Sequence, residues 1–243
     1  MNYIDAINQR ISRRSYLTTP IAPEKLEILQ KEIELVNEQS GLTVTLLEDA
    51  SEAFEGAKSY GMFQGVRSVL VLKGDKNAEH LKEKVGYYGE RLILAAQQLD
   101  LGTCWVGGTF DKSAKEFLTA ENEEIICVVP IGNVGNTTLK EKAMRTGIRR
   151  HSKSIEEMIR ADRPLTEEET EAMKLVQLAP TARNTQKAVF CFAGSRISAE
   201  VPDDSFFDLV DLGICKLHFE EGMKTLFPQG HFSWGNAGVF QTN

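Results

Sequence analysis

The stretch YYGERLILAAQQLDLG (residues 87–102) decides the fold, because it forms most of the strongest helix that the sequence predicts. Apolar side chains recur at helical spacing over residues 77–100, and Gly102 is placed to end that helix. The apolar runs SVLVL (68–72) and IICVVPI (125–131) predict a strand on either side of it. The first part of the chain also predicts helices over residues 3–11 and 23–37, the strand TVTLL (43–47) and a short helix from Asp111 to Leu118. This mixture indicates the α+β class.

A similar order of elements recurs, in abbreviated form, after residue 150. The second set comprises a short helix (154–159), a helix (167–178) with a capping box at Thr166 and Glu169, the strand AVFCFA (188–193), a long helix and the strand NAGVFQ (236–241). The two long helices share a local pattern, YYGERLILAA (87–96) against VDLGICKLHF (210–219). We interpret this as two related halves, residues 1–150 and a shorter half over 151–243. The alternative is that the order arises by chance in an α+β protein.

Composition argues against several classes of function. The chain has 243 residues and a net charge of −7, whereas binding to a nucleic-acid backbone needs surplus Lys and Arg. No apolar run approaches the ~20 residues that span a bilayer, and the start MNYIDAINQR lacks the apolar core of a signal peptide. The four cysteines form no CxxC pair, and the four histidines show no metal-ligand spacing. We therefore expect a soluble, cytoplasmic protein without a metal, membrane or nucleic-acid partner.

RISRRSY (10–16) is the densest basic cluster in this acidic chain. Alternate side chains of an extended segment share one side, so Arg10, Ser12 and Arg14 are expected to face the same way. Guanidinium groups bind phosphate through charge-assisted, bidentate hydrogen bonds, and a serine hydroxyl adds a donor. The segment is thus a candidate phosphate site. The alternative is a solvated helix C-terminus, where the helix dipole favours arginine.

LAPTARNTQ (178–186) is an unusually polar turn between a helix and an apolar strand. Pro180 must end the preceding helix, and Thr181 and Asn184 follow it in the turn. Side-chain amides both donate and accept hydrogen bonds, which suits the mixed edge of a pyrimidine-like ring. The alternative is an ordinary connection, because Asn and Thr are common turn residues.

Two further segments are weaker candidates. In LGTCWVGGTF (101–110), Gly107 and Gly108 permit a flat ligand to approach the backbone and its N–H groups. In IRRHSK (148–153), Arg149 and Arg150 form a second basic patch at the junction of the halves. The alternatives are a plain glycine-containing connection and a solvated basic linker.

Taken together, the four segments resemble the nitroreductase family, which binds FMN. The family's first signature is Arg-x-Ser-x-Arg/Lys-x-aromatic, and its second is Ala-Pro-Ser-x-x-Asn-x-Gln-Pro. RISRRSY fits the first at Arg10, Ser12, Arg14 and Tyr16, and APTARNTQK fits the second at Ala179, Pro180, Asn184 and Gln186, with Thr181 for Ser and Lys187 for the last Pro. LAAQQLDLGTCWVGG, IICVVPIGN and RRHSKSIEEMI resemble the family's remaining segments, so the resemblance covers most of the chain.

The order of the motifs departs from that of an ordinary member. There the second signature follows the first by a few tens of residues, whereas here ELVNEQSGLTV (34–44) occupies that place and does not fit. The fitting copy lies in the second half, where RADRPLT (160–166) lacks the serine of the phosphate motif. Family members are usually dimers with the flavin between subunits. The resemblance therefore implies a tandem, fused nitroreductase: an intrachain pseudo-dimer, monomeric or further associated, with one FMN per chain.

The resemblance also implies a role for each candidate residue. Arg10 and Ser12 would hold the FMN phosphate, helped by Arg149 or Arg150, and Arg14 would lie at the N1–C2 edge of the flavin. Pro180, Thr181 and Asn184 would contact the ring from the other half, and a backbone N–H at Gly107 or Gly108 would reach N5. NAD(P)H would donate hydride and a small nitroaromatic or quinone-like acceptor would be reduced in a ping-pong cycle. No catalytic side chain is expected.

Two other classes of function remain open at this point. One is a flavin-binding protein with little or no turnover, such as a sensor or a storage protein. The other is a fused scaffold that binds no flavin at all. Bleaching of a bound flavin by NADH or NADPH would separate the enzyme from the binder, and a colourless protein would favour the scaffold.

Overall fold

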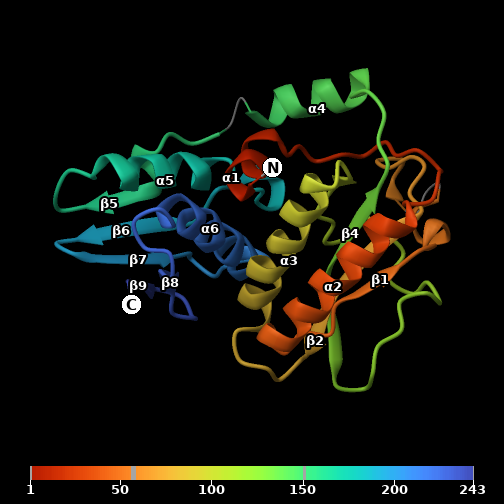
Figure 1. Cartoon of the computed structure of the whole chain (residues 1–243), viewed down its shortest axis with the longest axis horizontal. Helices are drawn as coiled ribbons and strands as arrows, with labels where there is room; N and C mark the ends of the chain where they lie inside the picture. Colours follow the sequence, from red (N-terminus) through yellow and green to blue (C-terminus); the bar gives the residue numbers. More distant parts are fainter. Residues whose placement is uncertain (1, 56–58, 150–151, 243) are drawn as a thin grey trace. The chain divides into compact units, whose positions relative to one another are not determined.

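The chain is described by a computed structural model that covers residues 2–55, 59–149 and 152–242. It divides into two compact units (Figure 1). The first unit comprises Gln9–Leu81 and Leu92–Thr146, and the second comprises the chain up to Asn8, Lys82–Arg91 and the chain from Gly147 onwards. These units differ from the expected halves, because the second unit includes residues 82–91 of the long helix α3 (Leu81–Gln98). The division into halves stays a prediction about duplication.

The first unit is an antiparallel sheet covered by helix α2 (Pro23–Ser40). Its strands are β1 (Thr45–Leu47), β2 (Ser68–Asp75), β3 (Gly102–Thr103) and β4 (Glu123–Gly132), in the order β1-β2-β4-β3. Helix α2 starts with Pro23 in its first turn and ends at Gly41, which adopts a left-handed φ of 73° and donates its N–H to the Asn37 carbonyl. A cluster of buried aromatic and β-branched side chains, including Phe54, Phe63 and Phe110, forms the core.

The second unit is built around α5 (Glu167–Gln177), α6 (Asp208–Met223) and a second sheet. The capping box predicted at its start opens α5: Thr166 accepts a hydrogen bond from the Glu169 N–H, and the Glu169 carboxylate accepts one from the Thr166 N–H. The sheet has the order β5-β6-β7-β9-β8, and its strands are β5 (Ile159–Ala161), β6 (Val189–Ala193), β7 (Arg196–Glu200), β8 (His231–Phe232) and β9 (Gly238–Gln241).

Both sheets repeat one topology. The order β1-β2-β4-β3 matches β6-β7-β9-β8, every one of these pairings is antiparallel, and a long helix follows the second strand in each set. Strand β5, which pairs in parallel with β6, is the one strand of the second sheet without a counterpart among the described residues. The order of elements expected from the sequence therefore extends to the order of strands.

The two long helices cross at a pair of glycines. A Cβ on Gly86 would lie 1.9 Å from the Val210 carbonyl oxygen, and one on Gly213 would lie 2.0 Å from the Glu83 carbonyl oxygen. Each glycine thus contacts the residue three positions before the other. Aligning the two helices on these contacts makes Glu83 equivalent to Val210, whereas the shared sequence pattern aligns Tyr87 with Val210, four residues further along α3. Because four residues are about one helical turn, apolar periodicity does not distinguish the two alignments.

Buried charged groups join the same two helices within the second unit. The Lys216 ammonium forms an ion pair with Glu83, and both side chains are about 1% exposed. Lys216 also donates to the carbonyls of Ser233 (3.1 Å) and Gly235 (3.0 Å). His218 Nε2 lies 3.1 Å from the Glu90 carboxylate, again with both side chains buried. Such groups persist in a core only when they are paired and hydrogen-bonded.

Several predicted elements end at other residues, and one is absent. Residues 111–118 form turns instead of the expected helix, because the Asp111 carboxylate accepts hydrogen bonds from the N–H and the hydroxyl of Ser113. The predicted helix at 154–159 is reduced to a 3-10 turn, Glu156–Met158. Helix α1 spans Tyr3–Gln9, and helix α4 (Leu139–Arg149) and strand β7 were not predicted. None of the helices in the described part of the chain combines the length and apolar character needed to cross a membrane.

Candidate functional site

The basic segment 10–16 runs extended along the first unit. Ser12 forms a parallel bridge with Thr103, and Ser15 forms one with Gln64. The Arg13 N–H donates to the Thr103 carbonyl at 2.8 Å, which holds the segment against β3. An extended backbone sends alternate side chains to opposite sides. The segment is therefore not the solvated helix end that was its alternative reading.

The expected side chains of this segment gather around one buried thiol, that of Cys104. Burial raises the pKa of the Cys104 thiol, and the Arg14 and Arg10 guanidinium groups and a hydrogen bond with Ser12 act in the opposite direction. Arg10, Ser12 and Arg14 therefore share one neighbourhood. The Arg14 Nε atom is buried and has no hydrogen-bond partner among the described residues. A buried guanidinium N–H without a partner is costly unless an acceptor completes the site.

The intervening arginine points elsewhere and reaches Glu141. Arg13 Nε donates to the Glu141 carboxylate at 3.2 Å, and Arg13 also donates to the Gly135 carbonyl. The same carboxylate accepts hydrogen bonds from the main-chain N–H groups of Arg14 (2.8 Å) and Ser15 (3.1 Å). It also closes a capping box with Thr138 at the start of α4. Glu141 thereby fixes the backbone on which Arg10, Ser12 and Arg14 are displayed.

The pKa of Glu141 reflects these hydrogen bonds. Its pKa is lowered to about 2: burial alone would raise it, but the hydrogen bonds from Arg14, Thr138 and Arg13 outweigh burial. Glu141 is not among the residues that the sequence motifs predicted. The signal was available, because Thr138 followed by Glu141 repeats the spacing of Thr166 and Glu169.

The glycine-containing segment 101–110 starts beside the basic segment 10–16. Thr103 and Cys104 contact the basic segment, and Val106 exchanges two hydrogen bonds with Val128 of β4, at 2.9 and 3.0 Å. Gly107 and Gly108 follow directly, Gly107 half-buried and Gly108 exposed. A Cβ on Gly108 would meet no heavy atom within 4 Å, so packing among the described residues does not require this glycine. The segment is consistent with an open approach to the backbone.

The turn 178–186 adopts a constrained conformation in the second unit. Three of its non-glycine residues, Arg183, Asn184 and Gln186, have positive φ values of 54°, 55° and 46°. Such residues cost energy and persist when their surroundings determine them. The Thr181 hydroxyl accepts from the Gln186 N–H at 3.1 Å, and the Ala182 N–H donates to both Asp211 carboxylate oxygens at 3.0 Å. The turn is thus pre-organised beside Pro180.

Buried groups beneath the turn determine which of its side chains are available. Gln186 is 1% exposed, and its amide bonds to the Lys153 N–H and the Gln177 carbonyl, so this amide is part of the interior. Asn184 remains half-buried, and its Nδ2 donates to the Ser152 hydroxyl at 3.3 Å. Burial raises the pKa of Asp211 to about 7, and the nearby Asp208 charge adds to this rise. The hydrogen bond from the Ala182 N–H acts in the opposite direction. Sequence reasoning missed Asp211, which looks like any polar residue on a helix.

The candidate residues are divided between the two units. Arg10, Ser12, Arg14, Gly107 and Gly108 belong to the first unit. Pro180, Thr181 and Asn184 belong to the second. Arg149 is the last residue of α4, and its side chain and all of Arg150 lie outside the described residues. A common site for the two motifs therefore stays a prediction.

Comparison with known proteins gives the family. The model of the family described as "Putative TM nitroreductase" matches residues 2–223. A putative nitroreductase from Thermotoga maritima is similar in structure, with a TM-score of 0.61 and 18% identity over 99% of this chain and 92% of that one. Two further similar structures are an FMN-dependent nitroreductase from Clostridium difficile (TM-score 0.47, 17% identity, 56% of this chain and 89% of that one) and a nitroreductase with bound FMN from Bacteroides fragilis (0.44, 13%, 57% and 95%). None of the curated proteins matches the chain.

The family match covers the first set of repeated elements in full and the second set as far as the end of α6. It includes the basic segment 10–16, the glycine segment and the polar turn 178–186. The T. maritima structure shares the fold over nearly the whole chain. The chain therefore belongs to this nitroreductase family and has its α+β fold.

Proposed function

We propose that this protein binds one FMN per chain and acts as an NAD(P)H-dependent oxidoreductase on small, electron-poor acceptors such as nitroaromatics or quinones. Family membership supports the class of reaction. The observation that carries the cofactor is the neighbourhood of Cys104, where two arginines and a serine gather and the buried Nε–H of Arg14 has no partner among the described residues. Donors of this kind fit an anionic, oxygen-rich group.

The residues present fit the groups of FMN one by one. Arg10 and Ser12 would hold the phosphate, with Arg149 or Arg150 as a further cation. Arg14, whose Nε needs an acceptor, would donate to the carbonyl edge of the ring. A backbone N–H at Gly107 or Gly108 would face the ring nitrogen N5.

The second motif would complete the site from the other unit. Pro180 and Thr181 would pack on the ring, and Asn184 would exchange hydrogen bonds with its edge. The positive φ values at Arg183 and Asn184 support a turn that is shaped before any ligand binds. Because each motif occurs in full once in the chain, we propose a single shared site rather than two.

FMN, when bound, would supply the hydride chemistry that links oxidation of NAD(P)H to reduction of the acceptor. The protein's part is to bind, orient and polarise. The Arg14 guanidinium would supply positive charge beside the ring, which would favour electron uptake. No side chain has to remove a proton for the hydride step, so we assign no catalytic acid or base. None of the four cysteines is in a disulfide, which suits a reducing cytoplasm.

The visible spectrum of the purified protein tests the proposal, with Arg10→Ala as the decisive variant. Wild-type protein should be yellow and should bleach on anaerobic addition of NADH or NADPH. Arg10→Ala should raise the FMN dissociation constant about ten- to hundredfold through loss of a charged hydrogen bond. Arg67→Ala is the matched control, because Arg67 lies in the same unit and pairs only loosely, at 3.5 Å, with Asp49.

Three outcomes would count against parts of the proposal. A colourless protein with no rise in melting temperature on adding FMN would contradict flavin binding. Unchanged FMN affinity in Arg10→Ala would contradict the phosphate assignment. A yellow protein that neither NADH nor NADPH bleaches would be a flavin-binding protein without turnover.

A further inference from the structure

One edge of the first sheet is open where the equivalent edge of the second sheet is covered. Strand β6 occupies the place in the second sheet that β1 occupies in the first. Beyond β6 lies β5, which pairs with it in parallel through Ile159–Phe190, Arg160–Cys191 and Ala161–Phe192. Beyond β1, the described part of the chain places no strand. Unpaired edges offer backbone N–H and C=O groups to another strand.

The hydrogen bonds around β1 identify the group that is left open. The Thr43 N–H donates to the Lys73 carbonyl, so the backbone of residue 43 faces β2. In an antiparallel strand, the backbone groups of successive residues face the partner strand and the open side in turn, so those of Val44 face outward. There the Val44 N–H donates to the Asn37 side-chain oxygen at 2.8 Å, and the Val44 carbonyl accepts from the Asn37 side-chain nitrogen at 2.9 Å. Leu46 is the next residue to face outward. No hydrogen bond described for the chain uses its N–H or carbonyl on that side.

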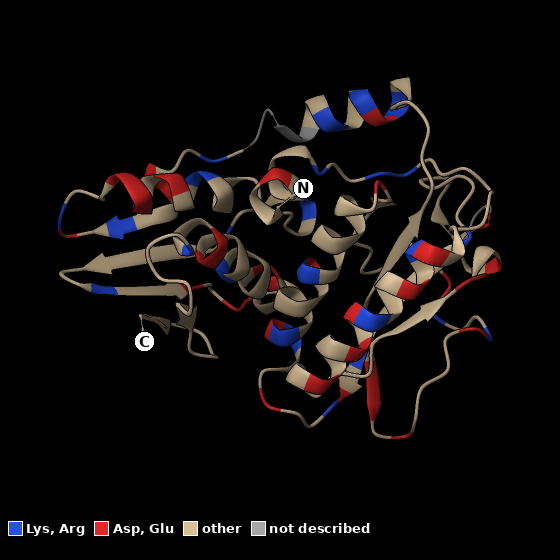
Figure 2. Ribbon diagram, in the orientation of Figure 1, with Lys and Arg blue, Asp and Glu red and all other residues tan. Residues whose placement is uncertain are grey.

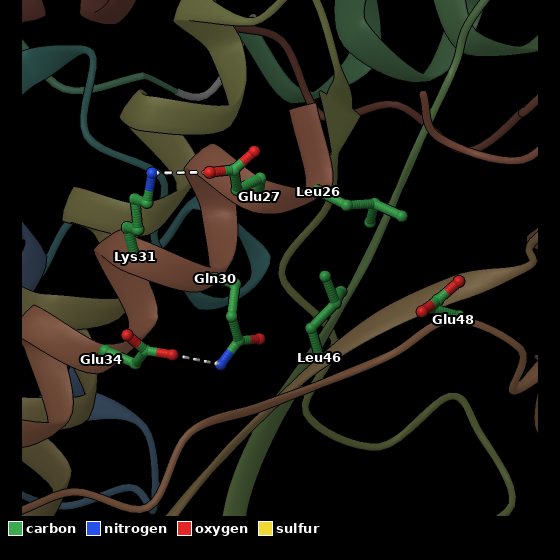
Figure 3. Close-up of a pocket in the computed structure, with 7 residues that line it drawn as sticks. All are labelled: Leu26, Glu27, Gln30, Lys31, Glu34, Leu46 and Glu48. Atoms are coloured by element: carbon green, nitrogen blue, oxygen red, sulfur yellow. Dashed lines mark hydrogen bonds and ion pairs between the residues drawn. The ribbon is translucent and has the colours of Figure 1, made fainter. Parts of the chain in front are cut away.

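A hollow of about 380 Å³ lies beside this edge (Figure 3). The side chains of Leu26 on α2 and Leu46 on β1 face it, with Glu48 further along the strand. In the second unit, the turn that leads into β5 contacts β6, and its Met158 is fully buried. The covered edge thus has both a strand and an apolar anchor, whereas the open edge has a hollow bordered by two leucines.

The negative charge of the residues that line the hollow favours a basic occupant. Glu27, Glu34 and Glu48 line it against a single cation, Lys31, which already pairs with Glu27 at 2.7 Å. Helix α2 as a whole carries five glutamates and two lysines (Figure 2). A second copy of this chain placed edge to edge would bring two such acidic linings together, which repels. A basic segment would be attracted.

We propose that the open edge of β1 and the hollow beside it bind an extended segment of a partner polypeptide, with an apolar residue flanked by basic residues. The segment adds a strand parallel to β1, as β5 does to β6, and bonds to the outward N–H and carbonyl of Leu46. Its apolar residue lies between Leu26 and Leu46. Its basic residues pair with Glu34 and Glu48. This site is independent of the flavin proposal.

The probe is the labelled peptide KSIKKMIRA, which is the sequence of residues 153–161 with lysine at positions 156 and 157. Fluorescence anisotropy at low ionic strength should show saturable binding to the full chain. The double variant Glu34→Lys/Glu48→Lys should weaken binding by about tenfold or more. Glu38→Lys makes the same charge change on α2 outside the hollow, and it should leave binding unchanged. Leu46→Pro should abolish binding, because it removes the outward N–H while an edge strand tolerates proline.

Circular dichroism should show that the variants keep the wild-type secondary structure. Absence of saturable binding to the wild type, or equal binding by the double variant and Glu38→Lys, would overturn the proposal. A concentration-dependent dimer that Leu46→Pro abolishes would overturn it as well, since a second copy would then be the occupant. Peptide binding that survives Leu46→Pro would refute strand addition.

Discussion

Replacement of Glu141 by glutamine should destabilise the protein strongly and in a pH-dependent way. The glutamine has the same shape but cannot carry the charge that Arg13 and the N–H groups of Arg14 and Ser15 all face. The Glu141 side chain is about 4% exposed, so water cannot replace those partners. The variant therefore leaves the buried Arg13 guanidinium without its counter-charge.

The size of the effect follows from the pKa of Glu141. The difference between the ordinary value of 4.5 and a folded value of about 2, at ~1.36 kcal/mol for each pKa unit, corresponds to about 3 kcal/mol. Because the folded pKa is the lower one, this stabilisation is complete above the unfolded pKa near 4.5. It is lost as the pH falls from there through about 2.

Denaturant unfolding of wild type and Glu141→Gln at several pH values is the assay. The gap in free energy of unfolding should be about 3 kcal/mol near neutral pH and should shrink steadily below about pH 4.5. The variant should also retain less FMN, because the backbone that displays Arg10 and Ser12 loses its anchor. Glu169→Gln is the matched control: Glu169 also closes a capping box and pairs with an arginine, but it contacts no residue of segment 10–16. It should lower stability and spare FMN binding.

Two results would refute this reasoning. One is a Glu141→Gln protein as stable as wild type near neutral pH. The other is a gap that stays constant as the solution is acidified, which would mean that the carboxylate charge contributes nothing and only shape matters.

The remaining predictions concern the second unit. Asn184→Ala should weaken FMN binding or shift the flavin potential, whereas Thr185→Ala, in the exposed part of the same turn, should do neither; identical titrations for both would argue against a shared site. Gly213→Ala should lower the free energy of unfolding by about 2 kcal/mol or more, because its Cβ would lie 2.0 Å from the Glu83 carbonyl oxygen. Gly147→Ala, a helical glycine with open space, should be neutral or slightly stabilising, and thermal melts that rank the two glycines the other way would contradict the helix crossing.

Local sequence patterns predicted most of the helices and strands. The capping box at Thr166 and Glu169, the buried strands β2 and β4 and the stripe of α3 all follow from short-range rules, and the structure bears them out. The helix expected at 111–118 fails for a local reason as well, because the Asp111 side chain closes a tight turn instead of capping a helix. The Asp111 carboxylate can either cap a helix or close a turn, and sequence spacing does not show which of the two will form.

Long-range pairing was beyond the reach of the sequence. Arg10, Ser12 and Arg14 were identified from composition and alternation, but Glu141, which anchors them, lies more than a hundred residues away. Asp211 beneath the polar turn is a similar case. The sequence did not predict where α3 and α6 cross, because apolar periodicity repeats with every turn. The close approach of the two backbones at Gly86 and Gly213 sets the crossing point.

The buried pairs between α3 and α6 have a consequence for any attempt to separate the repeated halves. A polypeptide cut near residue 150 would leave Glu83 and Glu90 on one fragment and Lys216 and His218 on the other. On either fragment the remaining charged groups would lie on a helix face that has lost its cover, so the pairs and the apolar burial beside them would be lost together. Neither fragment would be a self-sufficient module, and each would depend on the other as a folding template. Any recombination of the two repeated sets would therefore have to exchange α3 and α6 together.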